Sequence, residues 1–121
     1  MKTILIVEDE QSDADQLVAA LKPFSSKISI MSAGSGKEAM ECLKKKPADL
    51  VLLDISLPGY ISGSNLLFRQ EFKELPVILV SKMEEIDLKV MKVKFQNIRG
   101  YITKPVDAEA LRQAVSEALG I

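Results

Sequence analysis

Histidine is absent from this chain of 121 residues, and cysteine occurs only once, at Cys42. The lack of histidine excludes Ser–His and Cys–His catalysis, imidazole metal ligands and a phosphohistidine formed on this chain. A single cysteine excludes an intrachain disulfide and fits a reducing cytosol. We therefore expect a cytoplasmic protein whose chemistry uses carboxylates, hydroxyls and amines.

Long apolar runs and an imbalance of charge are also absent. No apolar run approaches the roughly 20 residues that span a bilayer, and the first run reaches Glu8 too early for a signal-peptide core. The chain has 16 basic and 17 acidic side chains, a net charge of −1, which gives no general attraction to nucleic acid or membrane. It also lacks a recognition-helix or zinc-finger pattern. We expect no membrane contact and no direct contact with nucleic acid.

Short apolar runs alternate with helix-like stretches five times along the chain. The expected strands are residues 4–7, 28–31, 50–53, 77–80 and 100–103. Such alternation predicts an α/β fold, a doubly wound parallel sheet of five strands between two layers of helices. The length is most simply that of one domain over residues 1–121.

Capping patterns predict where the helices begin. Ser12 with Asp15, and Ser35 with Glu38, have the spacing of a capping box. Asp107 is the expected cap of the last helix. Residues 84–95 are predicted to form a helix because three apolar residues recur there at helical spacing. These three residues are Ile86, Val90 and Val93.

Reactive side chains stand where four of the five expected strands end. Glu8 and Asp9 follow the first strand, Asp54 the third, Ser81 the fourth and Lys104 the fifth. Each feature alone has a plainer explanation, such as a solvated acidic pair or a turn serine. The carboxyl ends of parallel strands meet at one edge of a sheet, however, so their combination predicts a site at that edge.

The chemistry of this set favours a divalent cation and a phosphoryl group held on Asp54. Two carboxylates about 4 Å apart repel by about 4 kcal/mol in protein-like surroundings, so clustered acids favour binding of a cation. Oxygen ligands without Cys or His suit Mg²⁺. With the charge neutralised, a carboxylate can approach an anionic phosphoryl donor. An ammonium and a hydroxyl would then complete the ligation of the transferred group.

At this point the chain resembles the receiver domains of two-component response regulators, in particular the chemotaxis regulators. The resemblance is carried by Ile-Leu-Ile-Val-Glu-Asp at 4–9, Leu-Asp-Ile-Ser-Leu-Pro-Gly at 53–59 and Tyr-Ile-Thr-Lys-Pro at 101–105. It covers essentially the whole chain, and the three motifs together are highly specific. It implies a flavodoxin-like three-layer sandwich with strand order 2-1-3-4-5.

The resemblance also implies roles for the acidic residues. Asp54 would be the phosphoacceptor. Glu8, Asp9 and Asp54 would hold Mg²⁺ with help from the backbone carbonyl of Ser56. The phosphoryl donor would be a phosphohistidine on a sensor histidine kinase or a histidine phosphotransfer domain.

Other residues would bind the phosphoryl group and transmit its arrival. Lys104 would pair with the phosphoryl group, and its peptide bond to Pro105 would be cis. Ser81 would hydrogen-bond a phosphoryl oxygen, and Tyr101 would turn inward. These movements would alter a surface built from the fourth helix, fifth strand and fifth helix. That surface would bind an output protein or domain, and phosphorylation-dependent homodimerisation is one form of this response. The protein would be a switch and not an enzyme that turns over a separate substrate.

Three departures from the family pattern bear on mechanism. Gly63 stands nine residues after Asp54 where eight is usual, so the loop at 59–62 is one residue longer, with Tyr60 and Ile61 at its tip. Lys82 replaces a small residue after Ser81 and is a candidate modulator of phosphate loss. Asn97 replaces a glycine, and asparagine tolerates the left-handed conformation better than most residues.

Three other functions share parts of this pattern. A flavodoxin-like electron carrier would want a Ser, Thr or Gly phosphate loop where this chain has Glu8 and Asp9. A magnesium-dependent phosphatase with an Asp nucleophile would want a second acid at Ser56. A docking module of the same fold would undergo no chemistry on Asp54. We expect a phosphoryl-accepting receiver, with the docking module as the alternative.

Overall fold

Five parallel strands form one sheet in the computed structural model, which describes residues 1–56 and 63–121. The strand order is β2-β1-β3-β4-β5, so the predicted sheet and its order are confirmed. The strands are β1 (Lys2–Val7), β2 (Ile28–Ala33), β3 (Leu50–Leu53), β4 (Val77–Ser81) and β5 (Ile98–Thr103).

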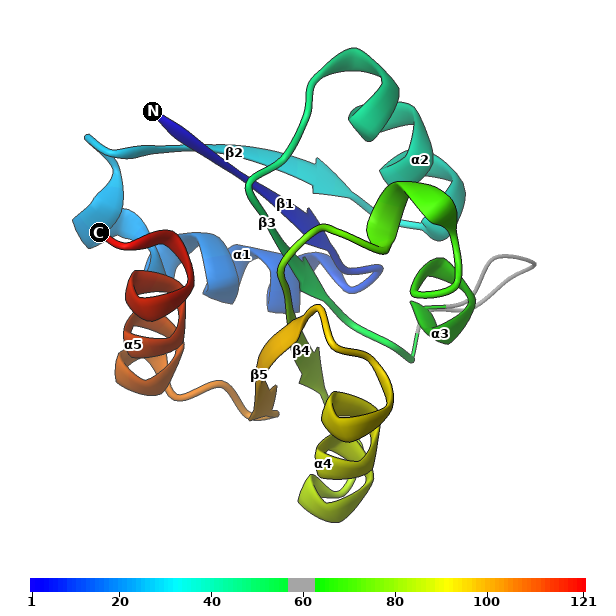
Figure 1. The fold of residues 1–121 in the computed structure, drawn as a ribbon. Coiled ribbons are helices and arrows are strands. Elements are labelled where there is room, and N and C mark those ends of the chain that lie inside the picture. Colours follow the sequence, from blue (N-terminus) through cyan, green and yellow to red (C-terminus); the bar gives the residue numbers. More distant parts are fainter. Residues whose placement is uncertain (57–62) are drawn as a thin grey trace.

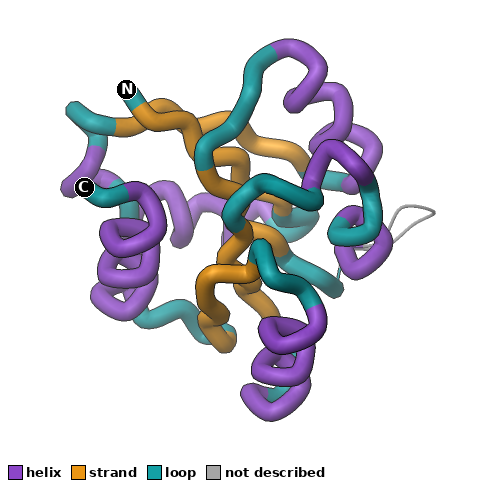
Figure 2. The backbone as a smooth tube through the Cα atoms, in the orientation of Figure 1, coloured by secondary structure: helices purple, strands orange, loops and turns teal. Residues whose placement is uncertain are grey.

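Helices cover both faces of the sheet (Figure 1). The α-helices are α1 (Gln11–Ala20), α2 (Gly36–Lys45), α3 (Gly63–Leu66), α4 (Glu85–Lys94) and α5 (Ala108–Leu119), and two 3₁₀ turns lie at Lys22–Phe24 and Gln70–Phe72. Helices α1 and α5 pack on one face, and α2, α3 and α4 lie on the other, with loops joining them around the orange strands of Figure 2. Among the described residues, no helix is both long and apolar enough to cross a membrane.

The central strands are apolar along their whole length because both of their faces are covered. Ile4 and Ile6 of β1 belong to the core beneath α1 and α5, whereas Leu5 and Val7 belong to the opposite core. All four side chains are 0% exposed. Alternation along a strand sends successive side chains to opposite faces, so two cores need continuous apolar runs. This constraint fixes where each strand ends and therefore where the polar residues begin.

The capping prediction is confirmed for α2. Ser35 is the N-cap, and its Oγ accepts a hydrogen bond from the Glu38 N–H at 3.2 Å. The Glu38 carboxylate reaches back and accepts from the N–H of Gly34, at 3.0 Å. The first bond satisfies an N–H that the first turn of a helix leaves without a partner, and the second satisfies the N–H of Gly34 just before the cap.

The capping prediction is wrong for α1. The helix begins at Gln11 with Glu10 as its N-cap, so Ser12 and Asp13 lie inside the first turn. The cause lies just before the helix, where the Glu8 carboxylate accepts a hydrogen bond from the Glu10 N–H at 3.1 Å. This contact turns the chain into the helix two residues earlier than the serine spacing indicates.

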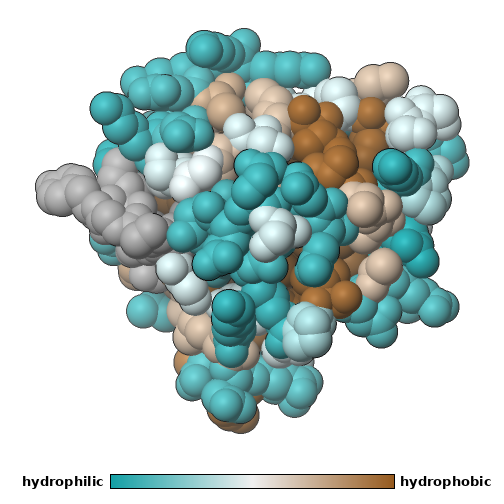
Figure 3. Space-filling model, turned by 180° about the vertical axis from the view of Figure 1, so that it is seen from behind, coloured by the Kyte–Doolittle hydropathy of each residue, from teal (hydrophilic) through white to brown (hydrophobic). Residues whose placement is uncertain are grey.

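Helix α4 forms as predicted, but the apolar residues that predicted it are not its buried side. Ile86, Val90 and Val93 are 66%, 60% and 86% exposed. The helix instead packs on the sheet through Leu88, with Met91 partly buried. Hydrophobic atoms are accordingly visible at the bottom of Figure 3, where α4 lies.

Asn97 has a different role from the one that its sequence position indicates. No non-glycine residue in the described ranges has a positive φ, so the left-handed conformation expected at Asn97 is not adopted. Its buried amide instead donates to the carbonyls of Phe72 and Leu75, at 2.7 and 2.9 Å. The side chain thereby fastens the turn before β5 to the 3₁₀ turn before β4. The loop tip with Tyr60 and Ile61 lies outside the described residues.

Replacement of Asn97 tests this role. Asn97→Gly and Asn97→Ala should each lower the free energy of unfolding by about 1–3 kcal/mol, because buried carbonyls lose their donors. Chemical denaturation measures this change, with Gln96→Ala at the neighbouring exposed position as the control. A neutral or stabilising Asn97→Gly would instead support the left-handed explanation.

Candidate functional site

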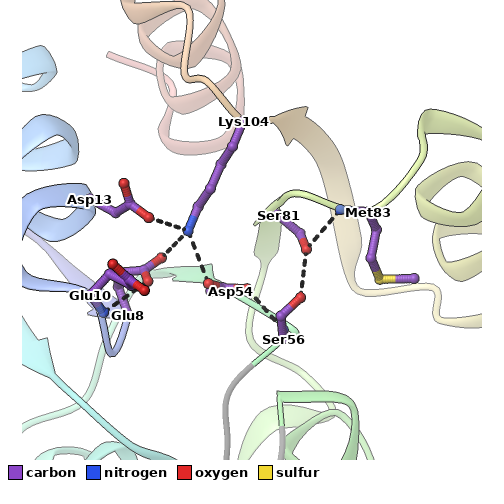
Figure 4. A network of polar contacts seen from close by, with 8 residues as sticks. All are labelled: Glu8, Glu10, Asp13, Asp54, Ser56, Ser81, Met83 and Lys104. Carbon is purple, nitrogen blue, oxygen red and sulfur yellow. Dashed lines mark hydrogen bonds and ion pairs between the residues drawn. The ribbon is translucent and has the colours of Figure 1, made fainter.

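The carboxyl ends of four neighbouring strands bring the predicted reactive residues together (Figure 4). Glu8 follows β1, Asp54 follows β3, Ser81 ends β4 and Lys104 follows β5. Backbone hydrogen bonds hold these ends level, because the Asp54 N–H donates to the Val7 carbonyl at 3.0 Å and the Lys104 N–H to the Ser81 carbonyl at 2.9 Å.

The Lys104 ammonium lies at the centre of three carboxylates. Its Nζ is 2.7 Å from Glu8 Oε2, 2.8 Å from Asp13 Oδ2 and 3.0 Å from Asp54 Oδ2. An ammonium has three N–H donors, so each of them has one acceptor here. The Lys104 side chain is only 6% exposed, and ion pairs so far from water are screened little by salt.

The remaining oxygens of Glu8 and Asp54 are bound by the backbone. Asp54 Oδ1 accepts from the Ser56 N–H at 2.8 Å, and Glu8 Oε1 accepts from the Glu10 N–H at 3.1 Å. Both carboxylates are therefore fixed by an ammonium on one side and a backbone amide on the other. Such fixed groups need little reorganisation when a ligand arrives.

Three of the acids could hold a metal ion. Glu8, Asp9 and Asp54 each offer one carboxylate oxygen, and these oxygens lie within 4.8 Å of one another. Glu8 and Asp54 are buried, whereas Asp9 is exposed. An oxygen-only set with one side open to water fits Mg²⁺, which keeps several of its own waters.

Burial and charge change the proton affinity of two groups in the site. Burial raises the pKa of Glu8 from 4.5 to about 7, against the opposing effects of the hydrogen bonds from Lys104 and the Glu10 N–H. Burial by itself lowers the pKa of Lys104, but its hydrogen bonds to Asp13, Glu8 and Asp54 outweigh burial and raise that pKa above its usual value. Lys104 is therefore a permanent cation here.

Ser81 and Ser56 lie on the other side of Asp54 from Lys104 (Figure 4). The two hydroxyl oxygens are 3.0 Å apart, within hydrogen-bond distance. Ser81 Oγ also accepts from the Met83 N–H at 3.2 Å, and Ser81 is 0% exposed. Ser56 therefore links the buried Ser81 hydroxyl to the Asp54 carboxylate, because it contacts both of them.

The other predicted residues lie around this cluster. The hydroxyl of the half-buried Tyr101 donates to Glu85 Oε1 of α4 at 3.3 Å. Lys82 is exposed next to Ser81. The peptide bond between Lys104 and Pro105 is cis, which is the geometry that the resemblance implies.

Sequence reasoning missed one member of the cluster, Asp13. It lies between Ser12 and Asp15, the pair whose spacing predicted a cap, but its carboxylate points at Lys104 from the first turn of α1 (Figure 4). A signal was available, because a helix that starts directly after a strand has its first turn at the same edge of the sheet. An acid there faces the same site as the acids at the strand ends.

Comparison with known proteins places this geometry in a family. Residues 4–116 match the response regulator receiver domain. The chain is 31% identical to PilH of Pseudomonas aeruginosa over 122 residues, with 98% of each covered. It is 36% identical to the sensory transduction protein RegX3 of Mycolicibacterium smegmatis and 34% identical to the response regulator PilR of P. aeruginosa, but spans 47% and 25% of their lengths.

Solved structures agree with the match in sequence. A CheY-like response regulator receiver domain from Methanospirillum hungatei superposes with a TM-score of 0.82 at 25% identity, over 99% of this chain and 94% of that one. A putative response regulator from Chloroflexus aurantiacus gives 0.83 at 26% identity, over 99% and 98%. The chain belongs to the response regulator receiver domain family.

Proposed function

We propose that residues 1–121 form a single receiver domain that accepts a phosphoryl group on Asp54 and so acts as a signalling switch. The observation that carries this proposal is the position of the Asp54 carboxylate. One of its oxygens lies 3.0 Å from a buried ammonium, and the other accepts a backbone N–H at 2.8 Å. Two further acids stand beside it. A carboxylate so oriented is suited to nucleophilic attack.

The phosphoryl donor would be a phosphohistidine on a sensor histidine kinase or a histidine phosphotransfer domain. An Asp54 oxygen attacks phosphorus, the phosphorus–nitrogen bond breaks, and the imidazole nitrogen keeps the electron pair and takes a proton. The product is an acyl phosphate on Asp54. Lys104 would bind a phosphoryl oxygen and offset the charge that moves onto it. Hydrolysis by water releases inorganic phosphate and restores the carboxylate.

Glu8, Asp9, Asp54 and the backbone carbonyl of Ser56 would hold Mg²⁺. The ion would neutralise negative charge between the carboxylates and the phosphoryl oxygens. The fit rests on the three carboxylate oxygens within 4.8 Å of one another. The raised pKa of Glu8 also marks an acid whose charged form needs a partner.

The switch would run from Ser81 to the surface formed by α4, β5 and α5. Ser81 Oγ would exchange the Ser56 hydroxyl for a phosphoryl oxygen, and Tyr101 would leave Glu85 and turn inward. Both residues touch α4 or the segment that leads into it. The same helix exposes Ile86, Val90 and Val93, and grouped apolar side chains of this kind often mark a binding surface.

The partners that follow from this function are a phosphodonor and an output protein or domain. RegX3 and PilR are longer than this chain, whereas PilH has about the same length. The proposal therefore includes both an attached output domain and a separate protein bound by the α4–β5–α5 surface, or a second copy of the chain as a phosphorylation-dependent homodimer. A cytoplasmic location and the lack of direct nucleic-acid contact remain predictions.

Phosphorylation of Asp54 can be tested directly. Intact mass after incubation with acetyl phosphate and Mg²⁺ should increase by one phosphoryl group, and EDTA or Asp54→Asn should abolish the increase. A second measurement with a cognate kinase and fast quenching covers a short-lived product. No increase in either experiment would favour the docking module, in which the fold binds partners without chemistry on Asp54.

The affinity for Mg²⁺ should depend on pH because Glu8 must lose a proton to bind the metal. Below the pKa of about 7 the ion displaces that proton, so affinity should rise by up to about tenfold per pH unit and level off above it. Calorimetric titrations between pH 5.5 and 8 measure this dependence, and Glu8→Gln should flatten it. A constant wild-type affinity over this range would contradict the assignment of Glu8.

Lys82 is proposed to change the lifetime of the phosphorylated state. Lys82 is exposed and comes directly after Ser81, so its ammonium would lie near the path of the water that attacks the acyl phosphate. Dephosphorylation of purified phosphoprotein should therefore differ between wild type and Lys82→Ala. Equal rates would show that the side chain serves only as solvated surface.

A further inference from the structure

Asp13 contacts the phosphorylation site without belonging to the acids that would bind a metal. Its carboxylate lies 2.8 Å from Lys104 Nζ and is 21% exposed. Glu8, Asp9 and Asp54 account for the possible metal ligands among the described residues. Asp13 therefore interacts with the site through Lys104.

The contact with Asp13 matters for the charge balance of the site. Four carboxylates lie in this site, and the Lys104 ammonium contacts three of them, all except that of Asp9. A divalent cation and that ammonium would balance three of these carboxylates, so Asp13 leaves one negative charge in excess. An incoming phosphodonor is an anion, and like charges in a poorly screened site repel strongly.

The three contacts of Lys104 differ in what can replace them. Glu8 and Asp54 would also face the metal ion or the phosphoryl group in the proposed function. Asp13 has no such second partner, so its carboxylate would keep its hold on Lys104 when those ligands arrive. Each N–H of the ammonium has an acceptor in this structure, so Asp13 would stay on an N–H that a phosphoryl oxygen could otherwise take.

We propose that Asp13 is a positioning residue that retains the Lys104 ammonium in the unphosphorylated protein and thereby slows phosphorylation of Asp54. This inference rests on the proposed function. It adds a residue that competes with the phosphoryl group for the same cation. The rate at which the switch is set would then depend on the strength of the Lys104–Asp13 ion pair.

Four variants separate this role from a structural one. Asp13→Ala removes the acceptor, Asp13→Asn removes only its charge, and Asp13→Glu restores a carboxylate. Asp15→Asn is the matched control, because it removes an acid from the same helix, where Asp15 accepts from Gln11 Nε2 at 2.8 Å on the exposed side. Melting curves of every variant report changes in stability, because a first-turn acid such as Asp13 stabilises a helix whatever its other contacts.

The first readout is the rate of phosphorylation by acetyl phosphate at saturating Mg²⁺, as a function of donor concentration. Asp13→Ala and Asp13→Asn should raise the ratio of maximal rate to half-saturating concentration by about tenfold, since hydrogen bonds to charged groups commonly contribute a factor of at least about ten. Asp13→Glu and Asp15→Asn should stay within about twofold of wild type. Wild-type or lower rates for both Asp13→Ala and Asp13→Asn would overturn the inference.

The second readout needs neither metal nor phosphodonor. The ¹⁵N-coupled ammonium signal of Lys104, assigned with Lys104→Arg, should exchange equally slowly with water in metal-free wild type and in Asp15→Asn, and faster in Asp13→Ala, where only the contacts with Glu8 and Asp54 remain. An exchange rate in Asp13→Ala equal to that of wild type would show that Asp13 does not hold the ammonium and would also overturn the inference.

The two readouts also separate this inference from the function on which it rests. If wild type is phosphorylated and Asp13→Ala is no faster, the inference alone fails. If wild type and every variant stay unphosphorylated, even with a cognate kinase, the proposed function fails, and the effect of Asp13 on its rate fails with it. If Asp13→Ala does not fold, Asp13→Asn, which keeps the shape of the side chain, decides both measurements.

Discussion

The buried ammonium of Lys104 is the group on which the arrangement of this site depends. It follows β5, and its three carboxylate partners come from the end of β1, the first turn of α1 and the end of β3. Removing one member of a buried ion cluster usually leaves another charge without compensation. The cation therefore holds together three acids that would otherwise repel one another, and it does so at the edge where the strands end.

The two-sided sheet determines which parts of this site can be predicted from the sequence. Continuous apolar runs marked β1, β3 and β4, and the first polar residue after each run stands at the shared edge. The grouping of Glu8, Asp54 and Ser81 follows from that pattern, whereas the strand order was implied by the resemblance to receiver domains. The apolar runs predict the site because both faces of these strands are buried, so polar side chains begin where the strands end.

The features that the sequence did not predict depend on contacts between distant segments. Asp13 lies between the expected capping pair Ser12 and Asp15, and only the approach of Lys104 from β5 shows its partner. Asn97 was expected to supply a backbone conformation, yet its amide binds two carbonyls that lie 25 and 22 residues earlier. In α4 the apolar spacing identified the helix but not its buried side, because the sheet selects Leu88. Local sequence patterns do not predict these partners or the buried side of α4, because both depend on segments distant in the sequence.

The two ends of α4 are attached to the rest of the molecule in different ways. Before the helix, Met83 is held by one hydrogen bond to the Ser81 hydroxyl, a group that can rotate. Beyond the helix, the buried amide of Asn97 fastens the chain through two hydrogen bonds to backbone carbonyls. In the proposed switch, a displacement that starts at Ser81 would therefore reach the start of α4 first, where Tyr101 also contacts Glu85, while Asn97 would hold the chain beyond the other end. Rotation of the Ser81 hydroxyl would then tilt the exposed apolar face of α4 about a point near Asn97.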